Sequence, residues 1–340
     1  MESHRRKIRF IINPISGTQN KKGIPALIEK YADRDRYEVE VTPTSHRGHA
    51  EKLAREAAQQ GYFAVVAVGG DGTINEVGRG LIHSETAMGI IPCGSGNGLA
   101  RHLHIPLEPK KAIEIINNGL VKMIDYGMMN EIPFFCTCGV GFDALVSFRF
   151  AMDGRRGMFT YMEKALLEFL KYQPDTYELE MDGGVKKFKA FLITCGNASQ
   201  YGNNAFISPH ASLQDGLLDI TILEPFTVID IPSLVFQLFN KLIGQNGRIK
   251  TFRCEKLTIR RKEEGVAHFD GDPIMLGKDI HVGIIRRGMQ ILVPRRVEYH
   301  PLERAQNFIN PMIEEVTSIN RQVINRNMEF LKNIIRGIKD

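Results

Sequence analysis

Short strand-like segments alternate with amphipathic stretches over the first 130 residues. Apolar and β-branched residues favour strands at Lys7–Ile12, Tyr37–Thr42, Ala64–Val68 and Met88–Ile91. The stretches between them predict helices over about 23–32, 50–60 and 73–82, the last of them capped by Thr73. Strands that alternate with helices at this spacing indicate an α/β fold with a doubly wound parallel sheet, which we assign to residues 1–130.

From Tyr177 onward the pattern changes to strands without intervening helices. Asp182-Gly183-Gly184 predicts a hairpin turn between strands at 177–181 and 185–195, and Arg286-Arg287-Gly288 predicts another between 282–285 and 289–293. This pattern predicts an antiparallel β-sandwich over residues 131–295. One unusually apolar helix, at about 231–243, either closes the sandwich core or lies on anionic lipid. Residues 296–340 read as a helical tail that packs on the protein or makes a homodimer.

Composition narrows the function classes. The chain has 340 residues and a formal charge of +5 with acids and bases mixed, which argues against a dedicated nucleic-acid binder. Its five cysteines are odd in number and lack CxxC spacing, which suits core thiols in a reducing cytoplasm. No signal peptide and no 18-residue apolar run is found, so we expect a cytoplasmic protein.

Three small-residue loops follow the first, third and fourth predicted strands. They are Asn13-Pro14-Ile15-Ser16-Gly17, Gly69-Gly70-Asp71-Gly72-Thr73 and Pro92-Cys93-Gly94-Ser95-Gly96-Asn97. In an open α/β sheet such loops converge on one crevice, where glycines and helix N-termini favour phosphate. A carboxylate there is repelled by phosphate unless a cation or a donor hydroxyl lies between them, so Asp71 points to phosphoryl transfer. The alternative is a tight turn in which Asp71 only satisfies loop amides.

A second glycine pattern favours a rival interpretation. Gly139-Val140-Gly141-Phe142-Asp143-Ala144 matches the GxGxxA dinucleotide fingerprint after a predicted strand. The match is weak, because no βαβα series follows it to build a second nucleotide domain.

The three loops together resemble the signature set of the diacylglycerol kinase catalytic-domain family, which includes soluble bacterial lipid kinases and the sphingosine and ceramide kinases. The resemblance covers residues 7–295 and implies a nucleotide-binding domain followed by a lipid-binding domain. Arg155-Arg156-Gly157 resembles the basic segment that reaches the ATP phosphates. The residues that the resemblance assigns to ATP are Asn13, Pro14, Ser16, Gly17, Thr44, Gly69, Gly70, Gly72, Thr73, Asn75, Glu76, Gly94, Ser95, Gly96, Asn97 and Arg156.

The resemblance also assigns roles to acids. Asp143 matches an aspartate that engages the polar head of the substrate in sphingosine kinases. Ser212, Asp215 and Leu217 lie in a segment that resembles the family's structural Mg²⁺ loop, and oxygen ligands suit that ion. Phe269-Asp270-Gly271-Asp272 aligns with the family's DGE element but has aspartate in place of glutamate. The resemblance makes Asp272 the base, with Asp71 and Asp270 the other catalytic candidates.

We therefore expect a peripheral, ATP- and Mg²⁺-dependent lipid kinase that phosphorylates a hydroxyl of diacylglycerol or of a sphingoid base. An NAD kinase and an inactive lipid-binding module are the alternatives. A run of bases predicts salt-sensitive attachment to anionic vesicles through Arg248, Lys250, Arg253, Arg260 and Arg261.

Overall fold

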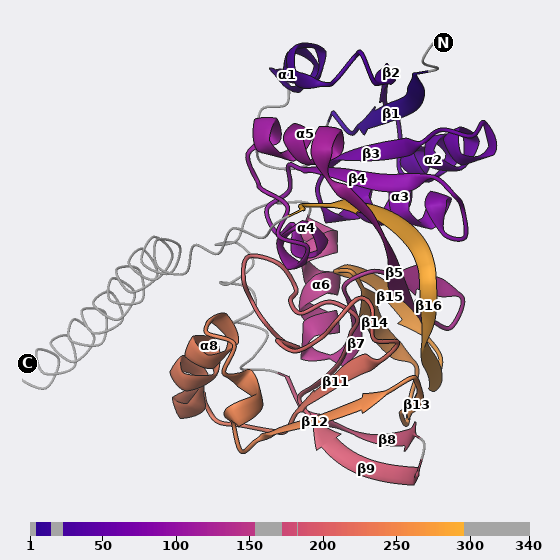
Figure 1. Ribbon diagram of the computed structural model, residues 1–340. Helices are drawn as coiled ribbons and strands as arrows, with labels where there is room; N and C mark the ends of the chain where they lie inside the picture. Colours follow the sequence, from indigo (N-terminus) through magenta and orange to yellow (C-terminus); the bar gives the residue numbers. More distant parts are fainter. Residues whose placement is uncertain (1–4, 15–22, 154–171, 182, 296–340) are drawn as a thin grey trace, which may run out of the picture. The chain divides into compact units, whose positions relative to one another are not determined.

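The computed structural model describes residues 5–14, 23–153, 172–181 and 183–295, all within one compact unit that ends at Arg295 (Figure 1). The predicted tail at 296–340, and with it the expected dimer contact, lies outside the described residues. No helix of the described ranges is long and apolar enough to cross a membrane.

The N-terminal half is the predicted doubly wound parallel sheet. Its strands run in the order β2-β1-β3-β4, with bounds β1 Arg6–Ile12, β2 Tyr37–Pro43, β3 Ala64–Gly69 and β4 Ala87–Pro92. The helices of this half are α1 Ile24–Tyr31, α2 His49–Gln59, α3 Asp71–Leu81, α4 Gly98–His102 and α5 Pro109–Asn118. Every residue of β3 and β4 is buried, as the apolar runs predict.

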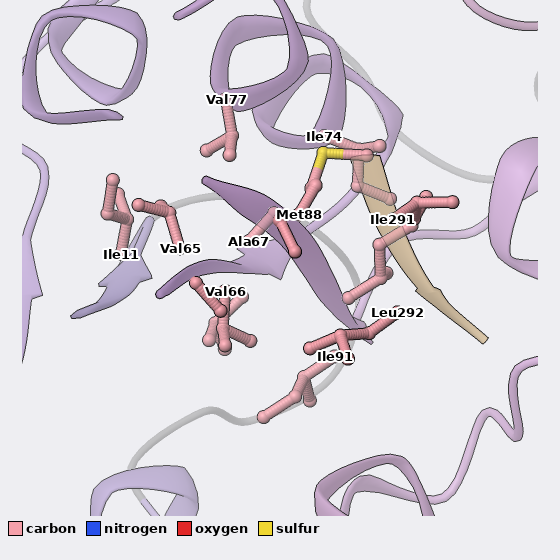
Figure 2. Close-up of a cluster of buried hydrophobic side chains, with 14 of the residues drawn as sticks. Ile11, Val65, Val66, Ala67, Ile74, Val77, Met88, Ile91, Ile291 and Leu292 are labelled. Atoms are coloured by element: carbon pink, nitrogen blue, oxygen red, sulfur yellow. The ribbon is translucent and has the colours of Figure 1, made fainter. Parts of the chain in front are cut away.

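Helices cover both faces of this sheet. Figure 2 shows Ile74 and Val77 of α3 on the side of Met88, with Val66, Ile91 and Leu292 on the opposite side. Side chains alternate between the two faces of a strand, so each strand contributes apolar side chains to the layers on both sides of the sheet.

The last described strand, β16 (Asp279–Val293), corrects one prediction. Arg286-Arg287-Gly288 is not a hairpin turn, because β16 runs straight through it and pairs with β5 (Leu120–Met129) on both sides. The register shifts between Ile285 and Met289, which marks a β-bulge, and Arg287 takes a positive φ of 50° there. At its far end Ile291 pairs in parallel with Met88, so this strand extends the N-terminal sheet.

The C-terminal half is the predicted antiparallel sandwich. One sheet has the order β12-β11-β10-β7-β14-β15, and the other continues from β16 through β13 and β8 to β9. Buried side chains from both sheets meet between them, among them Cys138, Leu179, Ile220 and Leu257. The bounds are β6 Ile132–Phe134, β7 Thr137–Gly141, β8 Asp175–Met181, β9 Gly184–Ala190, β10 Leu192–Gly196, β11 Leu218–Leu223, β12 Ile249–Cys254, β13 Lys256–Arg260, β14 Gly265–Phe269 and β15 Asp272–Leu276.

Two local predictions in this half need correction. The single strand expected at 185–195 is two strands, because the chain passes from one sheet to the other at Phe191. The GxGxxA segment begins in β7, whose neighbours β10 and β14 are antiparallel, so it does not open a βαβ unit. It leads instead into α6 (Phe142–Asp153).

The apolar helix predicted at 231–243 is shorter than expected. It is α8 (Ile231–Phe239), preceded by the 3-10 turn η2 (Val228–Asp230) and followed by η3 (Ile243–Gln245). All five cysteines are buried, as expected of core thiols.

Candidate active site

The glycine loops after β3 and β4 pack backbone against backbone. The N–H of Cys93 donates to the carbonyl of Gly69 at 2.7 Å, and a Cβ added to Gly94 would lie 2.7 Å from Cα of Gly70. Real Cβ atoms do not approach backbone so closely, so a side chain at Gly94 would force the loops apart. Glycine is therefore required there to bring the two loops together.

The first loop joins them through Asn13. Its N–H donates to the carbonyl of Val68 at 3.2 Å, and its side-chain amide donates to Oγ1 of Thr73 at 3.3 Å. Nearby, the N–H of Thr44 donates to the carbonyl of Ile12 at 2.8 Å. The structure thus brings the ends of β1, β2 and β3 together as the topology predicts. Ser16, Gly17 and Arg156 lie outside the described residues.

Thr73 is not the helix cap that its position suggests. The helix α3 begins two residues earlier, at Asp71, with Gly70 as its N-cap, and Thr73 is buried with its hydroxyl accepting from Asn13. Gly72 is consequently in the first helical turn, exposed, with open space where a Cβ would be. Ser95 is likewise exposed at the tip of the next loop. An exposed helix start edged by small residues suits an anion.

Asp71 holds the third loop in place. Its Oδ2 accepts the N–H of Asn97 at 2.9 Å, and its Oδ1 accepts the N–H of Gly98 at 2.7 Å. Burial raises the pKa of Asp71, and these two backbone hydrogen bonds act against that shift. Asn97, at a φ of 53°, closes the same loop by bonding both backbone groups of Gly94 through its side chain. Asp71 therefore does accept hydrogen bonds from loop amides, as the alternative interpretation of the sequence expected.

Asn75 and Glu76 make contacts within the protein. The amide of Asn75 donates to Oδ2 of Asp270 at 2.8 Å. The carboxylate of Glu76 accepts the N–H groups of Gly48 and Ala50 at 2.9 and 3.2 Å, which caps the start of α2. Both residues therefore position neighbouring elements.

Asp270 ties the two halves of the protein together. Besides Asn75 of α3, its carboxylate accepts the N–H groups of Phe135, Cys136 and Thr137 at 2.8, 2.7 and 3.1 Å. Two donors reach each oxygen, which fills the acceptor capacity of a carboxylate. Burial raises the pKa of Asp270, with the four donors opposing it.

Asp272 has a different environment two residues later. It is half-exposed at the start of β15, and its Oδ2 pairs with Nη2 of Arg47 at 2.9 Å. Arg47 comes from the loop between β2 and α2, so this contact also joins the two halves. Among the three acids expected to be catalytic, Asp272 is the one whose described partner is an exposed side chain.

Asp143 belongs to a buried polar network in the sandwich. Its Oδ2 accepts from Thr194 at 2.9 Å and from Tyr201 at 3.0 Å, and it lies 3.0 Å from Nε2 of His268. Its Oδ1 accepts the N–H of Ala144. Nδ1 of His268 is buried without a described hydrogen-bond partner, so Nε2 is the ring nitrogen that faces the carboxylate. Oδ2 is the more crowded oxygen, and the hydroxyls of Thr194 and Tyr201 beside it also lie 2.6 Å apart, whereas Oδ1 has one described donor.

Known proteins match both halves of this arrangement. The family model described as "Diacylglycerol kinase catalytic domain" matches residues 7–129, and the model described as "YegS C-terminal NAD kinase beta sandwich-like domain" matches residues 136–279. The diacylglycerol kinase of Bacillus subtilis is 30% identical over 295 residues, which cover 82% of this chain and 96% of that protein. The chain belongs to the diacylglycerol kinase family.

Further similarities agree with this membership. A probable YegS-like lipid kinase of Chromohalobacter salexigens is 33% identical over 211 residues, covering 60% of this chain and 68% of that protein. The crystal structure of a diacylglycerol kinase from Bacillus anthracis superposes with a TM-score of 0.66 at 19% identity, covering 87% and 100% of the two chains. At this level of identity, the structural similarity shows a shared fold. The named relatives are kinases, and this member of the family is a kinase.

In the expected metal loop of this diacylglycerol kinase family member, the carboxylate of Asp215 has partners within the protein. Its Oδ2 pairs with the guanidinium of Arg253, and its Oδ1 accepts the N–H of Leu217 at 3.1 Å. Arg253 also lies 3.4 Å from Asp219, so one guanidinium serves two carboxylates. The hydroxyl of Ser212 accepts from the backbone of Gln214. Across the described ranges, no cluster of three or more His, Cys, Asp or Glu side chains could hold a metal.

The motifs did not identify several residues of this site. Arg47 lies in a segment whose sequence predicts only the approach of the chain to a helix. In the sequence, 225 residues separate it from its partner Asp272. His268 and Thr194 lie within strands where alternation predicts core positions. The one available signal is the place of His268, two residues before Asp270.

Proposed function

We propose that this kinase transfers the γ-phosphoryl group of ATP to the free hydroxyl of diacylglycerol at a membrane surface. The observation that carries the proposal is the contact between the nucleotide-binding half and the segment Asp270-Gly271-Asp272. Asp270 bonds to Asn75 of α3, and Asp272 pairs with Arg47 of the loop after β2, so this segment contacts the nucleotide-binding half at two points.

The proposed ATP site is the exposed edge formed by Gly72 and Ser95, with Asn13 and Thr73 behind it. Backbone N–H groups at the start of α3 would face the phosphates, and small residues keep that approach open. Asp71 would act on this site mainly by holding the loop that begins α4. Mg²⁺, when bound with the nucleotide, supplies neutralising charge on the β- and γ-phosphates.

Asp272 is the proposed base. As the hydroxyl oxygen bonds to the γ-phosphorus, the bond from that phosphorus to the β–γ bridging oxygen breaks, ADP leaves, and the hydroxyl proton passes to the Asp272 carboxylate. Arg47, whose side chain is 81% exposed, can leave Asp272 at little cost when substrates arrive. We assign Asp270 a positioning role because its acceptor sites are occupied.

The network at Asp143 favours diacylglycerol over a sphingoid base. Thr194, Tyr201 and His268 crowd Oδ2, so an ammonium group would have to displace one of them or bind Oδ1 beside the N–H of Ala144. The name of the Bacillus subtilis relative agrees with this choice. We keep the division into an ATP-binding domain at 1–130 and a lipid-binding domain at 131–295 as part of the proposal.

Transfer of labelled γ-phosphate to a panel of acceptors tests the proposal. The panel consists of diacylglycerol, sphingosine and ceramide in mixed micelles, together with NAD in solution. We expect label in diacylglycerol that depends on Mg²⁺ and exceeds that in sphingosine. Label in NAD would make the protein an NAD kinase, and ATP-independent lipid binding without transfer would make it an inactive lipid-binding module.

A further inference from the structure

The outer face of η2 and α8 carries no charge and exposes two large apolar side chains. Ile229 is 90% exposed and Phe236 is 57% exposed, and seven residues, about two helical turns, separate them. Pro232, Ser233 and Asn240 are exposed on the same face. No charged residue occurs between Asp230 and Lys241, whereas a surface helix of a globular protein normally turns charged residues to water. We call this face, comprising Ile229, Pro232, Ser233, Phe236 and Asn240, the α8 outer face.

The opposite side of the helix anchors it. Leu234 is buried and Leu238 packs beside it, in a cluster with Phe191, Leu192 of β10, Leu223 of β11 and Ile249 of β12. Figure 1 shows α8 beside β11 and β12, in the same half as α6. Because one side of α8 is held by the sandwich, its outer face is a fixed surface.

The apolar cluster under α8 continues to the proposed lipid site. The ring of Phe142 lies 4.5 Å from that of Phe191, and Phe191 lies 4.7 Å from Phe226, measured between ring centroids. Phe142 directly precedes Asp143 and Tyr201 packs against the same cluster. The α8 outer face therefore lies one apolar layer away from the Asp143 network.

Charge around this face favours an anionic surface. Between Thr227 and Phe252 the only acid is Asp230, which accepts from Thr227 and pairs with Arg248 at 3.5 Å. Lys241, which directly follows Asn240 of this face, lies over the ring of Phe206 and has no described carboxylate partner. Lys250 lies on the other side of β12, because it pairs with Ile222 of the sandwich interior. Lys241 can therefore reach lipid phosphates beside an inserted apolar face.

The wider basic run predicted from sequence is not a free cationic surface. Arg253 pairs with Asp215 and Asp219, and Arg260 pairs with Glu180 and Asp279. Arg261 is buried and donates to four backbone carbonyls. We therefore expect membrane attachment through charge alone to be weaker than the sequence suggests. The α8 outer face becomes the main candidate for the membrane-binding surface.

We propose that the α8 outer face inserts into the surface of an anionic bilayer, with Ile229 and Phe236 as its apolar contacts and Lys241 at the headgroups. The proposal rests on the proposed function, because a lipid kinase must meet its acceptor at a bilayer. Apolar insertion predicts attachment that salt weakens only in part.

The chain has no tryptophan, which provides a direct test. Phe236→Trp places a single fluorophore on the α8 outer face, and Val185→Trp places a matched one on β9, where Val185 is 52% exposed. With vesicles of phosphatidylcholine and phosphatidylglycerol, we expect a blue shift and quenching by brominated lipid for Phe236→Trp alone. Equal responses at both sites, or none at site 236, would overturn the proposal. Emission already blue-shifted without lipid, or shifted by raising the protein concentration, would assign the face to residues 296–340 or to a second copy instead.

Kinase activity on dissolved and on vesicle-embedded diacylglycerol distinguishes a failure of this proposal from a failure of the proposed function. Ile229→Asp and Phe236→Asp should each lower vesicle partitioning about tenfold, since each loses the insertion of one large apolar side chain. Both variants should phosphorylate a short-chain, monomerically dissolved diacylglycerol at the wild-type rate and vesicle-embedded diacylglycerol more slowly. Wild-type partitioning in both variants would overturn the docking surface, whereas a wild-type protein inactive on both substrates would overturn the kinase assignment alone.

Discussion

Nη2 of Arg47 lies 2.9 Å from Oδ2 of Asp272, although 225 residues separate them in the chain. The side chains are 81% and 43% exposed, so the pair contributes about 0–1 kcal/mol to folding. The contact therefore adds little stability. It shows that an exposed cation and an accessible carboxylate lie together where the loop after β2 meets the start of β15.

Asp272→Asn should lower kcat about 10²- to 10⁴-fold, the usual effect of removing a general base, with ATP affinity nearly unchanged. Asp272→Glu should keep much of the activity, because it retains the carboxylate and has the family's side chain. Kinetics at saturating ATP and lipid measure both effects.

Asp279→Asn is the matched control, because Asp279 is an exposed acid paired with an arginine on β16, outside the proposed site. It should have wild-type kcat. Near wild-type turnover in Asp272→Asn would remove Asp272 as the base and return Asp71 to consideration.

Asp270→Asn should destabilise the protein by about 2–4 kcal/mol, because an amide oxygen can replace only one of the two carboxylate oxygens and the amide nitrogen would face donors. Asparagine tolerates the positive φ of 47° found at this position, so the backbone is not the cause. Asn75→Ala removes one of the four bonds and should cost less, about 1–2 kcal/mol. Denaturant unfolding of both variants tests the order, and equal stabilities would contradict a positioning role for Asp270.

The parallel sheet and its loops could be predicted because their signals are local. A buried strand, a glycine loop and a helix start occupy consecutive residues in Ala64–Leu81, and no distant partner is needed to read them. The bulge at Arg287 could not be predicted in this way. Its turn-like residues also fit a hairpin, and only the pairing of β5 with both sides of the bulge selects the continuous strand.

The polar contacts of the site show the same limit. Asp71 bonds to residues 26 and 27 positions away, and Asp270 bonds to residues 133–195 positions away. The sequence motifs singled out these acids, but they could not reveal which carboxylates accept from backbone donors and which stay exposed. That difference depends on tertiary packing.

Gly72→Val should abolish measurable ATP binding while leaving the thermal stability close to that of the wild type. Its Cβ meets open space, so the side chain would project into the proposed phosphate site without a clash. Calorimetric titration with ATP, together with a thermal melt, measures both properties. Gly277→Val is the control, because Gly277 is also exposed with open space but lies in the loop after β15. Unchanged ATP affinity in Gly72→Val would refute the loop assignment.

Removing metal should leave the stability of the nucleotide-free protein unchanged. Arg253 pairs with Asp215 and balances one of the two negative charges of Asp215 and Asp219, so we expect no structural ion there for a chelator to extract. Melting temperatures measured with a chelator and with added Mg²⁺ should agree. A rise with Mg²⁺ that Asp215→Asn abolishes would restore the sequence-predicted metal loop.

His102 should make folding stability fall as the solution becomes acidic. Its Nδ1 accepts the N–H of Ser199 at 3.1 Å, which requires a neutral ring nitrogen there, and burial lowers the pKa of His102 to about 4. In the unfolded chain a histidine takes up a proton near pH 6.5. Between pH 6.5 and 4 the unfolded state therefore binds more protons than the folded state, and stability falls by up to about 3 kcal/mol before levelling off.

His102→Asn retains an acceptor for the N–H of Ser199 but cannot titrate, so the difference in unfolding free energy from wild type should shift in its favour as the pH falls from 6.5 to 4. Comparing the two proteins at each pH cancels the contributions of all other acids and bases. His281→Asn, at an exposed histidine on β16, should keep the pH dependence of the wild type. Parallel curves for wild type and His102→Asn would show that His102 is protonated equally in the folded and unfolded states, which a neutral acceptor at Nδ1 does not allow.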